Sequence, residues 1–278
     1  MAESSFRRQF SELVAGPEQA LDLALASLLI AAHEYPELEI PRYLDRLERL
    51  GAAVCDRVGI AAPAEDRVEA VNRLLFEDEG FRGNLENYYD PRNSYLNDVL
   101  DRRTGIPITL STVYIEVARR AGLEVQGVGL PGHFIVRVSA SPGDVLLDPF
   151  NAGVRLSEDD CQRRVDRIFE GRVKLQPPML AACGRKEILA RMLRNLKSIY
   201  AQADDHERCL NIVDLLLRVQ PGSGADLRDR GLLYAALDCY SLALQDLEEY
   251  LARFPGAPEA GELMEKIATL RGKAARVN

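Results

Sequence analysis

Apolar side chains recur every three or four residues in the first part of the chain, which is the spacing of amphipathic helices. Leu47, Leu50 and Val54 share one face of such a helix. A second amphipathic pattern covers residues 64–78 and precedes two glycines. We therefore expect a helical segment over residues 1–79.

The pattern then changes from helical spacing to strand-like alternation. Pro107 opens a predicted helix over residues 107–121, where its missing N–H does no harm, and Gly122 follows as the C-terminal cap. Alternating apolar and polar positions predict three strands after this helix, at residues 123–130, 133–138 and 145–150. We expect an α+β core with an antiparallel sheet over residues 80–176, which with the helical segment makes one domain over 1–176.

From residue 185 the pattern is helical only, and it repeats with a period of 34 residues. The pairs 34 apart are Tyr200 and Tyr234, Cys209 and Ala243, Leu210 and Leu244, Pro221 and Pro255, and Gly222 and Gly256. This period, with an early Tyr and a final Pro, is typical of tetratricopeptide repeats. We expect an all-α repeat domain over residues 185–278 and a linker at 174–184.

Composition restricts the partners. With 35 basic and 43 acidic residues the formal net charge is -8, which disfavours nucleic acid as a general partner. The five cysteines are odd in number and form no CxxC pair, so we expect reduced thiols, a cytoplasmic protein, and neither a metal site nor a cofactor. The longest apolar stretch is shorter than the roughly 20 residues that span a bilayer, so we expect no membrane partner.

A histidine and an aspartate lie on two predicted strands joined by a hairpin. If Val138 faces Val145, His133 faces Phe150 and Asp148 is its diagonal neighbour on the same face, whereas a register shifted by one residue would put the two side chains on opposite faces. An Asp beside a His fixes the imidazole tautomer, as in the orienting half of a nucleophile–His–Asp triad. Alternatively, His133 is a half-buried histidine with satisfied hydrogen bonds and Asp148 is a turn carboxylate before a proline.

The order of these segments resembles the transglutaminase-like, papain-like core. That core has an RxGxC motif at a helix start, then His, then Asp; here "RTGIP" at 103–107 fits the motif with Pro107 in the cysteine position. Long stretches such as "NSYLNDVLDRRTGIPITLS" and "GLPGHFIVRV" are similar to the bacterial SirB-type regulator family. The resemblance implies a transglutaminase-like domain followed by tetratricopeptide repeats, and it does not define an activity.

Two hydroxyl groups could replace the missing nucleophile. Thr109 and Ser111 lie near the start of the helix that begins at Pro107, and Ser111 is one turn beyond it on roughly the same face. The alternative is that both hydroxyls bond main-chain groups near the helix start. Among the cysteines, only Cys161 is a candidate, and a weak one.

A polar and aromatic loop, "YYDPRNS" at 88–94, precedes the core helix. Its side chains Tyr88, Asp90 and Asn93 either bind a polar ligand in the same cleft or form a turn that caps the next helix.

Three functions remain open. The first is a protein without a nucleophile that binds a protein or peptide in the old cleft and uses its repeats as a second binding surface. The second is a cryptic hydrolase, amidase or protease-like enzyme with Ser111 or Thr109 as nucleophile, His133 as base and Asp148 as orienting group. The third is an adaptor that acts through the repeats alone. The sequence does not indicate an oligomeric state.

Overall fold

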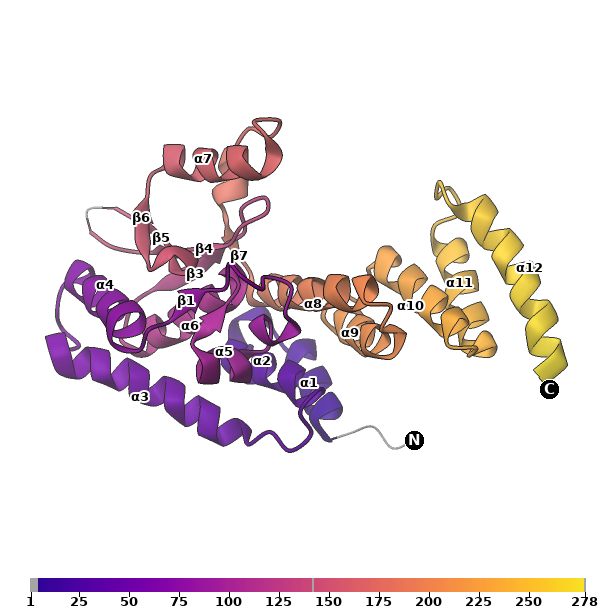
Figure 1. The fold of residues 1–278 in the computed structure, drawn as a ribbon, viewed down its shortest axis with the longest axis horizontal. Helices are drawn as coiled ribbons and strands as arrows, with labels where there is room; N and C mark the ends of the chain where they lie inside the picture. Colours follow the sequence, from indigo (N-terminus) through magenta and orange to yellow (C-terminus); the bar gives the residue numbers. More distant parts are fainter. Residues whose placement is uncertain (1–4, 142, 278) are drawn as a thin grey trace. The chain divides into compact units, whose positions relative to one another are not determined.

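The computed structural model describes residues 5–141 and 143–277, which divide into two compact units, residues 1–192 and 193–278. The elements of the first unit are α1 (Ser5–Ala15), η1 (Glu18–Ala20), α2 (Leu23–Ala32), α3 (Ile40–Val58), α4 (Ala64–Asn72), the π-helix η2 (Arg73–Asp78), β1 (Arg82–Gly83), η3 (Pro91–Asn93), α5 (Leu96–Arg102), β2 (Thr104–Gly105), α6 (Pro107–Arg120), β3 (Val125–Val128), β4 (Ile135–Val138), β5 (Val145–Asp148), η4 (Pro149–Asn151), β6 (Val154–Leu156), α7 (Glu158–Phe169), η5 (Pro177–Leu180) and β7 (Ala182–Cys183). The last five helices are α8 (Arg185–Gln202), α9 (His206–Val219), α10 (Gly224–Ala236), α11 (Tyr240–Arg253) and α12 (Ala260–Val277) (Figure 1). The α+β class predicted from the sequence is confirmed.

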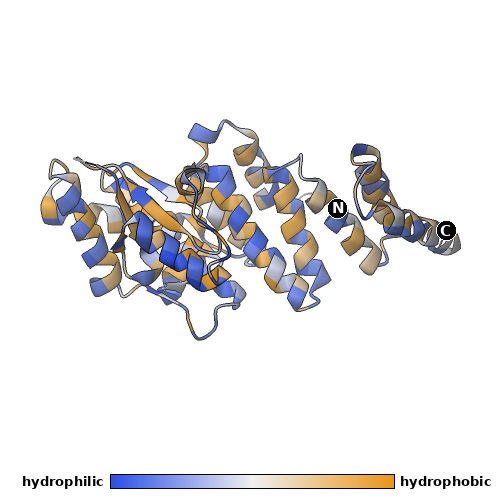
Figure 2. Ribbon diagram, turned by 90° about the horizontal axis from the view of Figure 1, so that it is seen from above, coloured by the Kyte–Doolittle hydropathy of each residue, from blue (hydrophilic) through white to orange (hydrophobic). Residues whose placement is uncertain are grey.

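The main sheet of the first unit has five antiparallel strands in the order β6-β5-β4-β3-β7. Its β4–β5 hairpin pairs Val138 with Val145, which is the register that the sequence argument for His133 and Asp148 assumes. The strands are largely apolar (Figure 2). Helix α6 packs against β3 and β4, and its residues Pro107–Ala118 are all buried.

Helix α2 lies deep in the first unit because its sequence, LALASLLIAA, is apolar on every side. The Asp22 side chain caps its start by accepting a hydrogen bond from the Leu25 N–H, which satisfies an otherwise unpaired donor. Helix α3 instead has a single apolar stripe that includes Leu47, Leu50 and Val54, and its other face is polar. The core of this unit therefore forms between α2, α6 and one face of the sheet.

The structure corrects the prediction that residues 174–184 are a linker between domains. This segment contains η5 and the short strand β7, which pairs with Gly127 and Val128 of β3 at one edge of the sheet. The sequence offered no alternation to reveal it, because a strand of two residues is too short to show a period.

The helices after α8 reproduce the internal repeat. Asp204 and Asp238 both have left-handed backbones, with φ of 53° and 57°, at turns 34 residues apart. At Gly231 a Cβ would meet the Leu247 side chain at 2.8 Å, so a small residue is needed where α10 and α11 cross. Leu263, Ile267 and Leu270 of α12 join the apolar core of this unit. In the described part of the chain, none of the helices has the length and apolar character needed to cross a membrane.

Candidate functional site

The sheet brings His133 and Asp148 together. His133 lies two residues before β4, directly after Gly132, whose φ of 69° turns the chain back toward the sheet. Asp148 is the last residue of β5. The observed register places them diagonally, and His133 Nε2 lies 2.9 Å from Asp148 Oδ2. The Asp148 side chain is 0 % exposed and that of His133 is 11 % exposed, so the pair is largely shielded from water.

Asp148 accepts hydrogen bonds from more groups than the sequence suggested. Its carboxylate accepts bonds from Arg164 Nε and Asn151 Nδ2, both at 2.8 Å, and from the main-chain N–H groups of Phe150 and Asn151. Burial alone would raise the pKa of Asp148, but the bonds from His133, Asn151 and Arg164 lower it overall. Asp148 is therefore a carboxylate at neutral pH, and an uncharged imidazole hydrogen-bonded to it carries its proton on Nε2.

That tautomer defines what His133 offers a ligand. With Nε2 donating to Asp148, the other ring nitrogen, Nδ1, carries a lone pair and accepts hydrogen bonds. Within residues 5–141 and 143–277 no hydrogen bond to Nδ1 is present. The imidazole is thus held in one orientation by Asp148, and its Nδ1 atom is available to a ligand. A general base or a hydrogen-bonding group requires both properties.

Pro107 occupies the first turn of α6, at the position that the sequence motif assigns to a cysteine. Ile106 is the N-cap, and Pro107 is buried. A proline has neither a nucleophilic atom nor a main-chain N–H, so the start of α6 lacks the group that a cysteine hydrolase needs there.

The two candidate hydroxyls bond main-chain groups. Thr109 Oγ1 donates to the carbonyl oxygen of Asn93 at 2.7 Å and accepts from the Ile106 N–H at 3.1 Å. Ser111 Oγ lies 3.4 Å from the carbonyl oxygen of Phe134 and donates to it. Both side chains are 0 % exposed, and among the described residues neither hydroxyl bonds His133. This arrangement is the main-chain alternative of the sequence interpretation.

Cys161 does not supply a reactive thiol. It packs in an apolar cluster with residues such as Val128, Ile135 and Leu156. Burial raises its pKa to about 11, so the thiol stays protonated at neutral pH. Buried thiols of this kind are poor nucleophiles.

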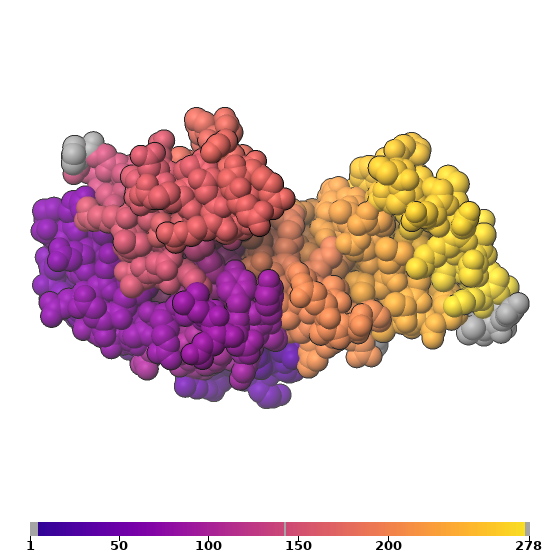
Figure 3. Space-filling view, turned by 45° about the horizontal axis from the view of Figure 1, so that its top comes forward, coloured from indigo at the N-terminus to yellow at the C-terminus, as the bar shows by residue number. Residues whose placement is uncertain are grey.

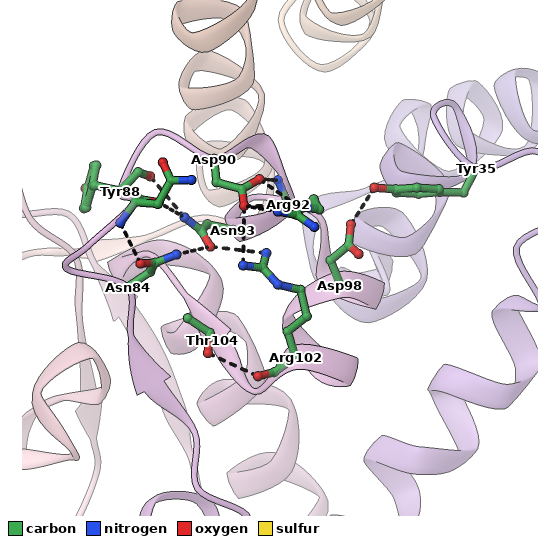
Figure 4. Close-up of polar contacts among 10 residues, drawn as sticks. Tyr35, Asn84, Tyr88, Asp90, Arg92, Asn93, Asp98, Arg102 and Thr104 are labelled. Atoms are coloured by element: carbon green, nitrogen blue, oxygen red, sulfur yellow. Dashed lines mark hydrogen bonds and ion pairs between the residues drawn. The ribbon is translucent and has the colours of Figure 1, made fainter.

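The loop of residues 84–95 is held by an internal polar network (Figure 4). Asn93 is 0 % exposed; its amide donates to the carbonyl oxygens of Asn87 and Tyr88 and accepts from Asn84 Nδ2. Asp90 caps η3 by accepting from the Arg92 N–H. Burial would raise the pKa of Asp90, but the bonds from Arg92 lower it overall. The polar atoms of Asp90 and Asn93 therefore hold the loop in place.

Tyr88 is the member of this loop that faces the His–Asp pair. Its ring stands edge-on to Phe150 at 6.5 Å, and Phe150 stands edge-on to His133 at 6.0 Å. Phe150 is fixed in turn by Gly83, where a Cβ would meet its ring at 2.5 Å. Tyr88 remains 39 % exposed, so these aromatic rings form a wall that extends from His133 to the surface. The loop and α7, the element that carries Arg164, lie on the same face of the first unit (Figure 3).

A second arginine, Arg191 of α8, holds the main chain at His133. Its Nη2 donates to the carbonyl oxygens of Leu130 and His133 at 2.8 and 2.7 Å, and its guanidinium stacks over the Phe134 ring. Arg164 and Arg191 were both missed in the sequence. They are 31 and 58 residues from His133 along the chain, and no motif marks either one.

Comparison with known proteins gives two family matches. The transglutaminase-like superfamily matches residues 41–194, and the tetratricopeptide repeat matches residues 196–268. The chain is 38% identical over 258 residues to a UPF0162 protein of Xylella fastidiosa, which covers 92% of each chain. It is 33% identical over 255 residues to a UPF0162 protein of Pseudomonas aeruginosa, which covers 90% of this chain and 92% of that one. Protein SirB1 of Salmonella typhimurium is 27% identical over 248 residues, with 88% and 92% covered. No solved structure shows significant similarity.

Proposed function

Because the chain belongs to the transglutaminase-like superfamily and to the UPF0162 family of bacterial proteins, and is similar to protein SirB1 of Salmonella typhimurium, we propose that it is a regulatory protein without a nucleophile. It binds a peptide or protein segment in the cleft beside His133. The observation that carries this proposal is the contrast at the site. The His133–Asp148 pair is intact, whereas the residue that the sequence motif aligns with a cysteine is Pro107, and the hydroxyls of Thr109 and Ser111 bond the main chain.

The chemistry of the cleft suits an extended peptide. His133 Nδ1 accepts one hydrogen bond, which a peptide N–H supplies. Tyr88 and Phe150 offer aromatic edges and faces beside it, and aromatic side chains contribute much of the binding free energy of protein interfaces. Neither feature requires a bond to be broken in the bound segment.

Photo-crosslinking tests this proposal in cells. With p-benzoylphenylalanine in place of Tyr88, the full chain is expected to crosslink to a protein partner, and the additional substitution His133→Ala is expected to reduce the product strongly. As the control for non-specific crosslinking, p-benzoylphenylalanine replaces Ile60, a residue of the same unit that is 60 % exposed. Equal crosslinking from both positions would contradict binding in this cleft.

The oriented His133–Asp148 pair is the one observation that favours a cryptic hydrolase as a second candidate. Catalysis would require Ser111 or Thr109 to leave its main-chain partner and approach His133 to within about 3 Å. A fluorophosphonate probe separates the two functions. We expect no labelling of the chain; labelling that disappears in Ser111→Ala or Thr109→Ala would establish the enzyme instead.

We further propose that the two domains divide the work. Tetratricopeptide repeats generally bind proteins, and residues 185–278 supply such a surface while residues 1–176 carry the cleft. The cysteines in the described residues, all of them free thiols, fit our proposal of a cytoplasmic location, where thiols stay reduced. No metal or cofactor takes part in this proposal.

A further inference from the structure

A groove of about 580 Å³ lies beside β3, at the end of the strand away from the turn that carries His133. Its walls include residues 123–127 along β3, residues 183–185 at the end of β7, and Arg119 near the end of α6. None of the groups of the His133 cleft lines it. The groove therefore requires an explanation independent of the proposed function.

The edge of β3 is only partly paired. β7 covers Gly127 and Val128 and goes no further, because the chain turns into α8 after Gly184. The hydrogen bond from Ser139 N–H to the Glu124 carbonyl oxygen, at 2.9 Å, shows that Glu124 directs its main-chain groups toward β4.

Main-chain direction alternates along an antiparallel strand, so Val125 and Gly127 direct their N–H and C=O groups to the other side. There Gly127 pairs with Cys183 of β7. Val125 has no such strand beside it, and no hydrogen bond of its main chain on that side is present in the described parts of the chain. A donor and an acceptor of β3 thus face the groove, ready to pair with one more residue in extended conformation.

Some charged side chains of the groove already form hydrogen bonds within the protein, and others do not. Arg185 donates to the carbonyl oxygens of Gln19 and Leu21, and Glu18 accepts the Lys186 N–H at the start of α8. Arg119 is exposed, and among the residues described it has neither a hydrogen bond nor an ion pair.

Arg119 also lies close enough to Arg185 for its charge, after burial, to lower the pKa of Arg185. The carboxylate of Glu124, also in the wall, stands on the exposed face of β3. The carboxylates of Glu116 and Asp22 offset this repulsion, but among the described residues the Arg119 guanidinium has no hydrogen bond or ion pair that would compete with an added carboxylate.

We propose that this groove binds the C-terminal end of an extended protein segment, which pairs with Val125 as a short added strand and places its carboxylate on Arg119. Strand addition at an open sheet edge supplies main-chain hydrogen bonds, and a guanidinium is a strong partner for a carboxylate. The proposal does not rest on the cleft at His133, since the two sites share no residue.

The probe is a library of random hexapeptides with free C-terminal carboxylates, passed over the immobilised full chain, beside the same library with amidated C-termini. We expect peptides to be retained from the first library and about tenfold fewer from the second, since charge-assisted bonds contribute on that order. Arg119→Ala is expected to abolish the difference. Arg49→Ala, which removes an exposed arginine paired with Asp45 on α3, is the matched control and should preserve it.

A second measurement locates the bound peptide. In the full chain labelled with ¹⁵N-valine, the retained peptide is expected to shift the Val125 amide signal, which Val125→Ile identifies by its disappearance. N-methylation of each peptide bond in turn should find one position at which binding is lost. Equal retention of acid and amide libraries, no retained peptide, or shifts confined to valines distant from the groove would each overturn the proposal.

Discussion

Asp148 accepts hydrogen bonds from two main-chain N–H groups and three side chains, and its carboxylate is fully buried. Such a group sets the positions of its partners as much as they set its own. Arg164 and His133 are both oriented by it, and the turn at η4 begins with its cap bonds. The geometry around His133 therefore depends on one carboxylate.

Replacing this carboxylate should be costly. Asp148→Ala leaves Arg164 and His133 without their buried partner, and breaking a buried charged network typically costs about 3–5 kcal/mol. Urea unfolding of the variant and the parent chain measures the difference in free energy. A loss below about 1 kcal/mol, the usual effect of a surface substitution, would show that the network contributes little.

The same carboxylate predicts a pH dependence. Its pKa in the folded chain lies below the ordinary value of 3.8, so the stability it contributes is fully present above that value and is lost as pH falls through the lowered pKa. Asp148→Asn, which cannot ionise, should therefore weaken the dependence of stability on pH below about 4. Melting temperatures of both chains between neutral and acidic pH test this, and parallel curves would contradict it.

At the scale of elements, the two repeats use different chemistry at equivalent positions. Leu196 and Ile212 are buried in the first repeat, and the residues 34 further on are Arg230 and Asp246. Arg230 forms a bidentate pair with Asp246, at 2.7 and 2.8 Å, and a third contact with Asp214. An ion pair between buried Asp246 and partly buried Arg230 thus stands where the preceding repeat has two buried apolar residues.

Mutagenesis can replace the Arg230–Asp246 ion pair with the apolar residue types found at the equivalent positions of the preceding repeat. Asp246→Ile alone should destabilise the chain by about 3 kcal/mol, because Arg230 keeps its charge and loses its main partner. Arg230→Leu together with Asp246→Ile should restore most of that loss, since an apolar pair often replaces a buried ion pair without cost. A double-mutant cycle by chemical unfolding gives the coupling free energy, and a value near zero would refute the account.

Elements also show what the sequence could predict and what it could not. Local alternation predicted the two strands of the β4–β5 hairpin, but their register was only an assumption, and the structure supplies the pairing that brings His133 beside Asp148. The strand β7 escaped prediction because two residues have no period. Arg164 and Arg191 reach the site from α7 and α8, and contacts between elements so far apart in sequence leave no local signal.

At the scale of the whole molecule, the first compact unit extends to residue 192, well past the boundary at 176 expected from the sequence. Its last residues belong to α8, where Ile188, Leu189 and Met192 are almost fully buried. The hydroxyl of Ser27 on α2 also donates a hydrogen bond to the sulfur of Met192, at 3.7 Å between oxygen and sulfur. The start of α8 therefore completes the core of the first unit.

Truncation tests that statement. A fragment of residues 1–176 loses β7 and buried apolar side chains that include Leu180, Ile188, Leu189 and Met192. Each of these large side chains contributes about 1.5–3 kcal/mol, from a total stability on the order of 5–15 kcal/mol. We expect this fragment to lack a cooperative thermal transition, whereas residues 1–203, which retain α8, should keep one. Thermal unfolding followed by circular dichroism compares the two fragments. Equal cooperative transitions would contradict the inference that the first unit needs residues 177–192 to fold.

We propose that Pro107 fills the place of a nucleophile beside the His133–Asp148 pair. The most direct measurement is the rate at which iodoacetamide alkylates the new thiol in Pro107→Cys at pH 6, followed by peptide mass spectrometry. A thiol at a helix start beside His133 should react at least about tenfold faster than an ordinary cysteine, and His133→Ala should remove the enhancement. A rate equal to that of an ordinary thiol, with or without His133, would contradict the claim.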